Sequence, residues 1–512
     1  MGENKIIIDK DFAIGRIDDR IFGSFVEHMG RVVYSGIYEK DHPSTDENGF
    51  RKDVVDLAKQ MGVTTVRYPG GNFVSNYNWM DGIGPIENRP KKRDLAWKSI
   101  ETNEVGIDEF MKWAKKYDVE PIMAVNMGTK GLEEAIALLE YCNSEKGSYY
   151  SDLRVKNGNE EPYNIKTWCL GNEMDGEWQL GHKTAQEYGR LAHEIGKAMK
   201  LVDPEIELVV CGSSMSRNAT FGAWEQEVLK NTYDEADYIS LHQYYDGQEK
   251  GTKSFLARSL DMEKYIDLVC AISDLEKKKR GSKKTINICF DEWGVWSTPD
   301  YEVQRWVDEH PWQIAPPLGE QIYSLEDSLL FASMLMVLLR KCDRVKIGCQ
   351  SLLVNISACI MTKKGGEAWV QPIYYPFKML ANHAKGKVID SRYLGVRYQT
   401  EDIEDVPLLD SLVTYDDDNN EMAIFIVSRS EKEEELSIKI RDCENVEIIE
   451  SQLLYSNDIK ANNAVNHELV KPEVADNVAI SKGDVRITIK PFSFQMLRVK
   501  LKYNIQEKGE PV

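Results

Sequence analysis

The segment INICFDEW, residues 286–293, is apolar at almost every position until it ends in two carboxylates and a tryptophan. Longer helical patterns separate it from seven similar runs: FGSFVEH (22–28), TTVRYPGG (64–71), EPIMAVNMG (120–128), NIKTWCLGNE (164–173), IELVVCGS (206–213), YISLHQYY (238–245) and VKIGCQSLLVN (345–355). Nearly continuous apolar runs are typical of parallel strands buried on both faces. Eight such runs alternating with helices predict an α/β fold, a (β/α)8 TIM barrel over residues 18–383.

The segments between the runs place apolar residues at helical spacing. Residues 53–62, 107–118 and 184–203 show this pattern most clearly. The longest apolar stretch, Leu329 to Leu339, is shorter than the roughly 20 residues that a membrane span needs. We therefore expect a buried helix there and no association with a membrane.

The pattern of polar and apolar residues changes after residue 383. Polar and apolar residues alternate in EMAIFIVSRS (421–430), EELSIKIRD (434–442) and VRITIKPFSFQMLRVKL (485–501). Turn-forming residues such as DDDNN (416–420) separate some of these segments. This pattern predicts a C-terminal antiparallel β-sandwich over residues 384–502, which takes an N-terminal strand from residues 1–17. Residues 503–512 are polar, and we expect them to form a frayed tail.

Composition excludes several classes of protein. The formal net charge of −20 argues against a nucleic-acid partner, because such proteins neutralise phosphates with clustered basic residues. The basic group Lys91 to Arg93 is interpreted as a solvated loop.

The nine cysteines show neither CxxC pairs nor zinc-ligand spacing, and the run Ile6 to Ile8 is too short for a signal peptide. We therefore expect free thiols and a cytoplasmic protein.

Polar residues interrupt the apolar runs mainly where the predicted strands end. In a (β/α)8 barrel these C-terminal strand ends carry the active site. The residues concerned, in chain order, are Glu27, His28, Arg67, Gly70, Gly71, Asn72, Asn126, Asn172, Glu173, His242, Tyr244, Asp291, Glu292, Gln350 and Asn355. Their common location favours a functional reading over a series of independent structural accidents.

Glu173 and Glu292 end predicted strands 4 and 7, so they can face each other across the barrel mouth. Glycoside hydrolysis uses such a pair, in which one carboxyl group protonates the leaving oxygen and the other attacks or activates water. The nearby amides and aromatic residues suit a sugar. Five tryptophans are predicted on this side of the barrel: Trp79, Trp97, Trp178, Trp293 and Trp296.

Each residue also has a structural interpretation. Glu173 could be a charge at a helix N-terminus, and His242 could be a core histidine with satisfied hydrogen bonds. Asp291 is expected to support the site while Glu292 points inward, although strand alternation alone also allows the reverse. The glycines of PGGN (69–72) could serve only a tight turn, and the tryptophans could pack beneath a lid.

Metal binding is the rival use of these carboxylates. Glu27, Glu173, Glu292 and His242 are residue types that bind a divalent ion in isomerases built on this barrel. The adjacent amides of Asn72, Asn172 and Gln350 favour sugar hydroxyl groups over a hard cation. We expect no metal and no cofactor.

Taken together, these motifs resemble those of glycoside hydrolase family 51, the α-L-arabinofuranosidases, which are intracellular (β/α)8 enzymes with a β-sandwich. The resemblance spans the whole barrel and is looser in the sandwich. The matching segments are FGSFVEHMGRVVYSGIYE (22–39), VRYPGGNFVSNYNWMDGIGP (66–85), RDLAWKSIETNEVGIDEF (93–110), WCLGNEMDG (168–176), SLHQYY (240–245), FDEWGVW (290–296) and QSLLVN (350–355).

The resemblance implies a retaining mechanism, with Glu173 as the acid/base and Glu292 as the nucleophile. The residues that it implies for holding the furanose ring are Glu27, Asn72, Asn172, Tyr244 and Gln350, with His242 and Trp97 as further members of the pocket. We expect Asn172 and Tyr244 to donate hydrogen bonds to the Glu292 carboxylate. A retaining pair lies about 5–5.5 Å apart, against about 6.5–9.5 Å in inverting enzymes, so the short separation is predicted.

By the same resemblance, the substrate is an arabinofuranosyl oligosaccharide derived from arabinan or arabinoxylan, cleaved from its end, and the protein is a homo-oligomer, a hexamer by analogy. Two other functions stay open. One is a different retaining glycosidase on the same barrel, such as a β-xylosidase or an endoglucanase. The other is a carbohydrate-binding protein without turnover, which the presence of both Glu173 and Glu292 disfavours.

Overall fold

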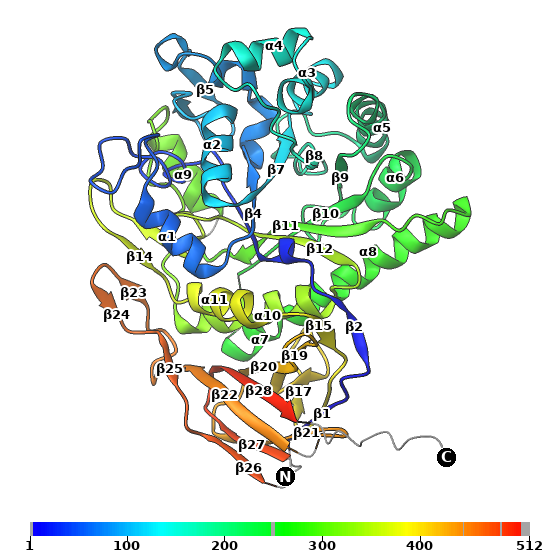
Figure 1. Ribbon diagram of the computed structural model, residues 1–512, viewed down its shortest axis with the longest axis vertical. Helices are drawn as coiled ribbons and strands as arrows, with labels where there is room; N and C mark the ends of the chain where they lie inside the picture. The colour runs from blue at the N-terminus through cyan, green and yellow to red at the C-terminus, as the bar shows by residue number, and fades with distance from the viewer. Residues whose placement is uncertain (1–3, 247–250, 299, 444, 482–483, 503–512) are drawn as a thin grey trace, which may run out of the picture.

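The computed structural model describes residues 4–246, 251–298, 300–443, 445–481 and 484–502. The predicted tail, residues 503–512, lies outside these residues. A barrel with surrounding helices forms the larger part of the molecule, and two β-sheets pack below it (Figure 1).

The barrel is closed by eight parallel strands, which confirms the predicted fold class. Each strand coincides with one of the apolar runs in the sequence. In chain order they are β3 (Gly23–Phe25), β4 (Thr65–Tyr68), β7 (Glu120–Val125), β8 (Thr167–Leu170), β9 (Glu207–Cys211), β10 (Tyr238–Tyr245), β11 (Asn287–Val295) and β12 (Val345–Gln350). Strand β12 pairs with β3 through Cys349 and Gln350, and this pairing closes the ring.

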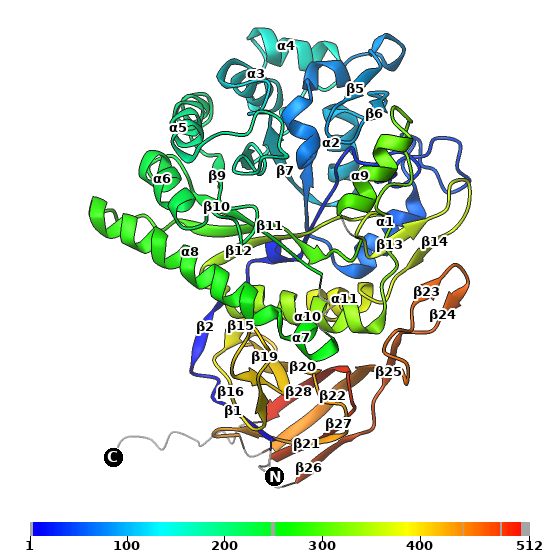
Figure 2. The same ribbon diagram turned by 180° about the vertical axis from the view of Figure 1, so that it is seen from behind.

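Helices cover the outside of the barrel, as Figure 2 shows for α5, α6 and α8. They are α1 (Lys52–Met61), α2 (Ile107–Tyr117), α3 (Leu132–Asn143), α4 (Tyr149–Lys156), α5 (Ala185–Val202), α6 (Ala223–Thr232), α7 (Thr252–Ala257), α8 (Ser259–Arg280), α9 (Asp300–Glu309), α10 (Leu325–Arg340) and α11 (Tyr374–His383). Helix α10 contains the long apolar stretch and is buried from Leu325 to Leu339, because it lies between the barrel and the sandwich. Among the described residues, no helix is both long enough and apolar enough to cross a bilayer.

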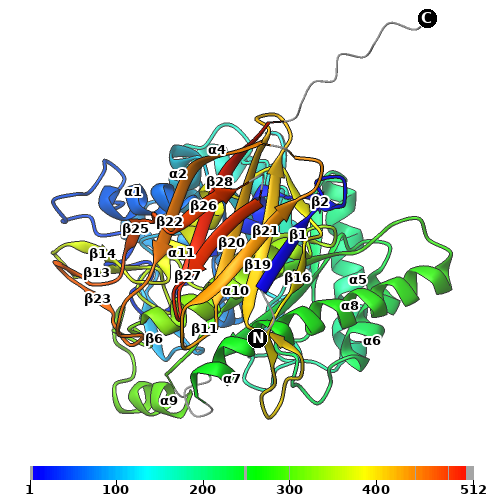
Figure 3. The same ribbon diagram turned by 90° about the horizontal axis from the view of Figure 1, so that it is seen from below.

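The C-terminal part is a sandwich of two sheets (Figure 3). One sheet contains β16 (Arg392–Leu394), β1 (Asn4–Ile8), β21 (Glu434–Ile440), β27 (Asp484–Ile489) and β26 (Val478–Ser481), in this order. The other contains β2 (Ala13–Arg16), β15 (Lys387–Ile389), β19 (Leu409–Asp416), β20 (Glu421–Ser428), β28 (Phe494–Lys502), β22 (Asn445–Leu454) and β25 (Pro472–Val474).

The predicted N-terminal strand lies inside the first of these sheets. Ile6 and Ile8 are fully buried in the sandwich core. Strand β1 is antiparallel to β16 but parallel to β21, so the sheet is not purely antiparallel. A strand from the far end of the chain can adopt either direction because no short turn connects it to its neighbours.

Several local details differ from the sequence prediction. The segment 485–501 forms two strands, β27 and β28, which separate around Pro491 because proline donates no ladder hydrogen bond. The hairpin of β5 (Lys92–Asp94) and β6 (Ser99–Glu101) overlaps the basic group that was interpreted as a solvated loop, and helix α9 was not predicted. Four 3-10 helices and three small hairpins complete the description: η1 (Asp19–Phe22), η2 (Asn72–Asn76), η3 (Trp79–Gly82), η4 (Ile86–Asn88), β13 (Ile360–Thr362) with β14 (Ala368–Val370), β17 (Arg397–Tyr398) with β18 (Val406–Pro407), and β23 (Asn463–Ala464) with β24 (His467–Glu468).

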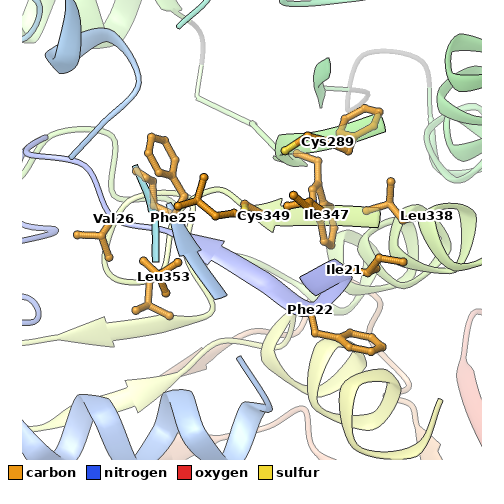
Figure 4. Packing of buried hydrophobic residues seen from close by; sticks show 14 of the residues in the cluster. Ile21, Phe22, Phe25, Val26, Cys289, Leu338, Ile347, Cys349 and Leu353 are labelled. Carbon is orange, nitrogen blue, oxygen red and sulfur yellow. The ribbon is translucent and has the colours of Figure 1, made fainter. Parts of the chain in front are cut away.

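All nine cysteines are free thiols, as predicted, and eight of them are buried. Figure 4 shows Cys289 and Cys349 in the core beside Ile347, near the point where β12 meets β3. They fill volume there in the same way as their aliphatic neighbours.

Candidate active site

The C-terminal ends of β8, β10 and β11 bring together the two predicted catalytic carboxylates and a histidine. One carboxylate oxygen of Glu173, one of Glu292 and a ring nitrogen of His242 all lie within 4.8 Å of one another. The parallel strands of a closed barrel end at the same rim, so residues far apart in sequence meet there.

Glu292 is held by two donors. Arg67 Nη1, from the end of β4, donates to Glu292 Oε1 at 2.7 Å, and Tyr244 Oη donates to Oε2 at 2.9 Å. The predicted donation from Asn172 to Glu292 is wrong. Its amide nitrogen donates to Asn72 Oδ1 at 3.2 Å, and its oxygen accepts from Arg67 Nη2 at 2.7 Å.

Asp291 lies beneath Glu292 and also faces into the barrel. Its Oδ2 forms an ion pair with Arg67 Nε at 3.1 Å, and its Oδ1 lies 3.3 Å from His242 Nε2 and accepts a hydrogen bond from Ser240. The pairing register of β11 shifts between Phe290 and Trp293, and such an irregularity allows consecutive side chains to reach one side. Burial alone would raise the pKa of Asp291, but the positive charges of Arg67 and His242 lower it to about 2.

Glu173 follows β8 with a φ of +44°, a left-handed conformation that is unusual for a residue other than glycine. Its Oε1 lies 3.0 Å from His242 Nδ1, and Trp178 Nε1 donates to its Oε2 at 2.6 Å. Burial and the negative charge of Glu292 raise the pKa of Glu173 above its usual value, against the opposing effect of His242. A raised pKa favours the protonated form of this carboxyl group, which a proton donor requires.

The hydrogen bonds that Glu27 accepts from the described residues both go to one of its oxygens. The backbone N–H of Phe73 and the indole of Trp97 both donate to its Oε1, at 2.9 and 3.1 Å. Trp97 reaches this position on the β5–β6 hairpin, where Asp94 accepts hydrogen bonds from the backbone of Ala96 and Trp97. Burial and the charge of Glu292 raise the pKa of Glu27 to about 8.

Gly71 has a steric role beyond that of a turn. A Cβ atom at this position would lie 2.9 Å from Glu292 Oε1 and 3.2 Å from Glu27 Oε2. The backbone of PGGN thus passes directly beside both carboxylates, and only glycine allows this approach.

Gly71→Ala is expected to lower kcat/KM about 100-fold, since a displacement of about 1 Å at a catalytic group can have this effect. Glu292 cannot move aside freely, because Arg67 and Tyr244 hold it. Steady-state kinetics would measure the loss. Gly131→Ala is the matched control, because its Cβ would meet no atom within 4 Å and its φ of 178° suits any residue. Unchanged kcat/KM in Gly71→Ala would contradict this steric role.

Some predicted site residues are bound to the protein backbone or packed in the core. Gln350 lies at the end of β12, and among the described residues its amide donates to the backbone oxygen of Ser357 at 2.8 Å. Trp79 and Trp293 are buried and pack against Tyr141 and Phe331, so they belong to the core. Trp97, Trp178 and Trp296 stay at the mouth: they contact Glu27, Glu173 and Tyr244, respectively.

Two positively charged side chains, Arg67 and His242, face the carboxylates of the site. Asp291 and Glu292 face Arg67, whose pKa is raised by both carboxylates in spite of its burial. Burial alone would lower the pKa of His242, but Glu292 and Asp291 raise it well above its usual value. Glu173, His242 and Glu292 have the spacing of a metal site. However, side chains of the protein already donate to both carboxylates, and the donor set therefore fits a metal-free site better.

Two residues that hydrogen-bond to the catalytic carboxylates, Arg67 and Trp178, had only weak signals in the sequence. Arg67 was visible as a polar residue at a strand end, but its two neighbours Glu292 and Asn172 come from other strands. Trp178 follows the GNE motif in a loop, and its hydrogen bond to Glu173 depends on the path of that loop. Neither contact follows from a repeating pattern of residues, so the sequence alone could not predict it.

Comparisons with known proteins agree with this geometry. A family model described as the α-L-arabinofuranosidase 1 domain matches residues 57–261, and one described as the α-L-arabinofuranosidase C-terminal domain matches residues 291–493. The chain is 50% identical to an intracellular exo-α-(1→5)-L-arabinofuranosidase 1 of Bacillus subtilis (strain 168), over 98% of this chain and 99% of that protein. It is 43% identical to an exo-α-(1→6)-L-arabinofuranosidase of Bifidobacterium longum, with 97% of each chain covered.

The fold is also shared. A solved family 51 α-L-arabinofuranosidase from Bifidobacterium longum superimposes with a TM-score of 0.92 at 42% sequence identity, covering 97% of this chain and 99% of that one. Sequence, fold and the pair of facing carboxylates lead to the same conclusion: the chain belongs to the α-L-arabinofuranosidases of glycoside hydrolase family 51.

Proposed function

We propose that the protein is a retaining, exo-acting α-L-arabinofuranosidase that releases terminal arabinofuranosyl residues from arabino-oligosaccharides by double displacement. The observation that carries this proposal is the close approach of Glu173 and Glu292: one carboxylate oxygen of each lies within 4.8 Å of the other. This spacing leaves little room for the water that an inverting pair must enclose, and it favours direct attack by one carboxylate.

In the first step, Glu292 attacks the anomeric carbon, and the bond between this carbon and the leaving oxygen breaks. Arg67 and Tyr244 orient the attacking carboxylate. Glu173 gives its proton to the leaving oxygen, so that the aglycone departs as a neutral alcohol. The product is an arabinosyl ester on Glu292.

In the second step, Glu173 takes a proton from water, which attacks the anomeric carbon and releases Glu292. Esterification has removed the negative charge of Glu292, one of the causes that raise the pKa of Glu173. The pKa of Glu173 therefore falls in the intermediate, and the same group can now act as a base. Two inversions at one carbon give net retention of configuration.

We propose that the furanose ring is held by neutral and charged hydrogen-bonding groups around this pair. The residues are Glu27, Asn72, Asn172, Tyr244, His242, Trp97 and, from the end of β12, Gln350. One oxygen of Glu27 accepts no hydrogen bond from the described residues, so this oxygen can form a hydrogen bond with a sugar hydroxyl group.

The linkage and the biological setting also belong to this proposal. The two relatives are named for different linkages, α-(1→5) and α-(1→6), so family membership does not decide between them. We propose short fragments of arabinan or arabinoxylan as substrates, taken up and cleaved in the cytoplasm. The intracellular relative and the free, buried thiols support this compartment. A homo-oligomer, a hexamer by family analogy, is proposed with it.

A panel of aryl glycosides tests the activity. The aryl α-L-arabinofuranoside should be hydrolysed with a kcat/KM at least about 100-fold above that of the aryl β-xyloside and β-glucoside, because a furanose-shaped pocket misplaces a pyranose anomeric carbon by about 1 Å or more. The NMR spectrum of the first-formed sugar should show the α anomer. A faster xyloside would replace the proposed substrate class, and a β product would overturn the retaining route.

A further inference from the structure

Two donors occupy the two oxygens of Glu173. His242 Nδ1 lies 3.0 Å from Oε1, and the indole nitrogen of Trp178 donates to Oε2 at 2.6 Å. Each oxygen of Glu173 therefore already has one hydrogen-bond donor of the protein beside it. When one of these oxygens carries the acidic proton, the hydrogen bond that it accepts from the protein weakens, and the donor that moves more easily can leave as the leaving group arrives.

The two donors differ in their freedom to move. The His242 side chain is 3% exposed, and its other nitrogen is fixed by Asp291 at 3.3 Å and by Ser240 Oγ at 3.2 Å. Trp178 is 51% exposed and belongs to the loop that follows β8. The mobile partner is therefore Trp178, and the oxygen that it covers, Oε2, is the one that can turn to the leaving group.

The path of this loop places the indole. The backbone N–H of Gly176 donates to the oxygen of Glu173 at 2.9 Å and closes a turn. A Cβ atom on Gly176 would lie only 2.5 Å from two carbon atoms of the Trp178 ring, so the indole rests directly on this glycine. Asp175 anchors the same turn by accepting from the Ser214 backbone at 3.0 Å.

We propose that Trp178 is a positioning residue: its indole N–H holds Oε2 of Glu173 while the carboxylate is ionised, and it leaves that oxygen when the leaving group arrives. This inference rests on the proposed acid/base role of Glu173. An N–H donor stabilises a carboxylate more than a carboxylic acid, because the acidic proton competes for the same oxygen. Trp178 therefore assists the base step, and its weakened hydrogen bond lets it leave Oε2 in the acid step.

The pKa of Glu173 gives a readout that a purely structural role would not change. Trp178 opposes the rise in this pKa that burial and Glu292 cause. We expect the other titratable groups around Glu173 to stay in place when the indole is removed. They are His242 and Tyr244 of β10, Glu292 of β11 and Tyr265 of α8, with Asp291 and Arg67 behind them.

The test is Trp178→Phe, which deletes the N–H and keeps a ring. The pH dependence of kcat/KM is measured on an arabino-oligosaccharide, whose leaving group needs protonation. Activity is lost as pH rises through the pKa of the acid. This alkaline limb should move upward by about half to one pH unit, since one hydrogen bond to a charged group is lost. The half-exposed position of Trp178 leaves the unfolding midpoint nearly unchanged.

Two further variants separate the N–H from general effects of the loop and of the indole. Gly176→Ala keeps Trp178 but displaces its ring, so it should move the alkaline limb in the same direction. Trp296→Phe also removes an indole N–H at the barrel mouth, but among the described residues this N–H has no hydrogen-bond partner, and the limb should stay in place. Equal shifts in Trp178→Phe and Trp296→Phe, or no shift in Trp178→Phe, would overturn the inference.

The same assay distinguishes failure of this inference from failure of the proposed function. Glu173→Gln should abolish the alkaline limb in the residual activity if Glu173 is the acid. If the limb persists in Glu173→Gln, the role of Glu173 is wrong and both proposals fall. If it disappears there while Trp178→Phe behaves like the parent enzyme, only the role of Trp178 is wrong.

Discussion

Glu292→Ala is expected to lower kcat by about 10⁵-fold or more on every substrate, including aryl arabinofuranosides with good leaving groups. The neighbouring carboxylate Asp291 cannot take over the covalent route, because it lies deeper and is held by Arg67 and Ser240. A better leaving group does not replace a missing nucleophile. The loss should therefore be independent of the leaving-group pKa, as a plot of log kcat against that pKa would reveal.

Two measurements make this result specific. The unfolding midpoint should stay close to that of the parent enzyme, since Arg67 keeps Asp291 as its ionic partner. A mechanism-based arabinofuranosyl inhibitor with a fluorine atom should label the parent enzyme at Glu292, and peptide mass spectrometry identifies the labelled residue. Labelling at Glu173 or Asp291, or activity that recovers as the leaving group improves, would contradict the assignment.

The barrel could be predicted from the sequence because its signal is local and repeated. Each strand is a short apolar run that ends in polar residues, and each helix has its own apolar face, so element type does not depend on distant contacts. The β5–β6 hairpin lacked such a signal, and helix α9 was not predicted although it has an apolar face. They are stabilised by each other's segments, through the ion pair between Lys98 and Asp308 and the contact of Arg93 with the Trp312 ring.

In the candidate site, too, the sequence predicted local features but not contacts between distant residues. Strand ends identified Glu173, Glu292 and Glu27, because the rim of a barrel collects whatever residues end its strands. The donor to Glu292 could not be assigned, since Arg67 and Asn172 are both polar residues at strand ends and only their positions in space separate them. The tryptophans divide for the same reason: Trp293 and Trp296 are three residues apart, yet one packs in the core and the other reaches the mouth.

Glu173→Ala should produce a different defect from that of Glu292→Ala. An aryl leaving group of low pKa departs without a proton, so arabinosylation of Glu292 should stay fast on such a substrate. The second step loses its base and should slow by about 10²- to 10⁴-fold. The ester then accumulates, which gives a burst of aryl alcohol and a low apparent KM. Glu177→Ala, which removes an exposed carboxylate from the same loop, is the control and should show neither effect.

Azide separates the two carboxylates by the product that it yields. In Glu173→Ala this small anion can enter the space left by the side chain and attack the arabinosyl ester without a base. Turnover should then recover, and the product should be the α-arabinosyl azide, because the second inversion restores the original configuration. In Glu292→Ala no ester forms, so azide must attack the substrate directly and give the β product. If the retained azide arises from Glu292→Ala and not from Glu173→Ala, the two roles are reversed, and Trp178 then donates to the nucleophile instead of the acid.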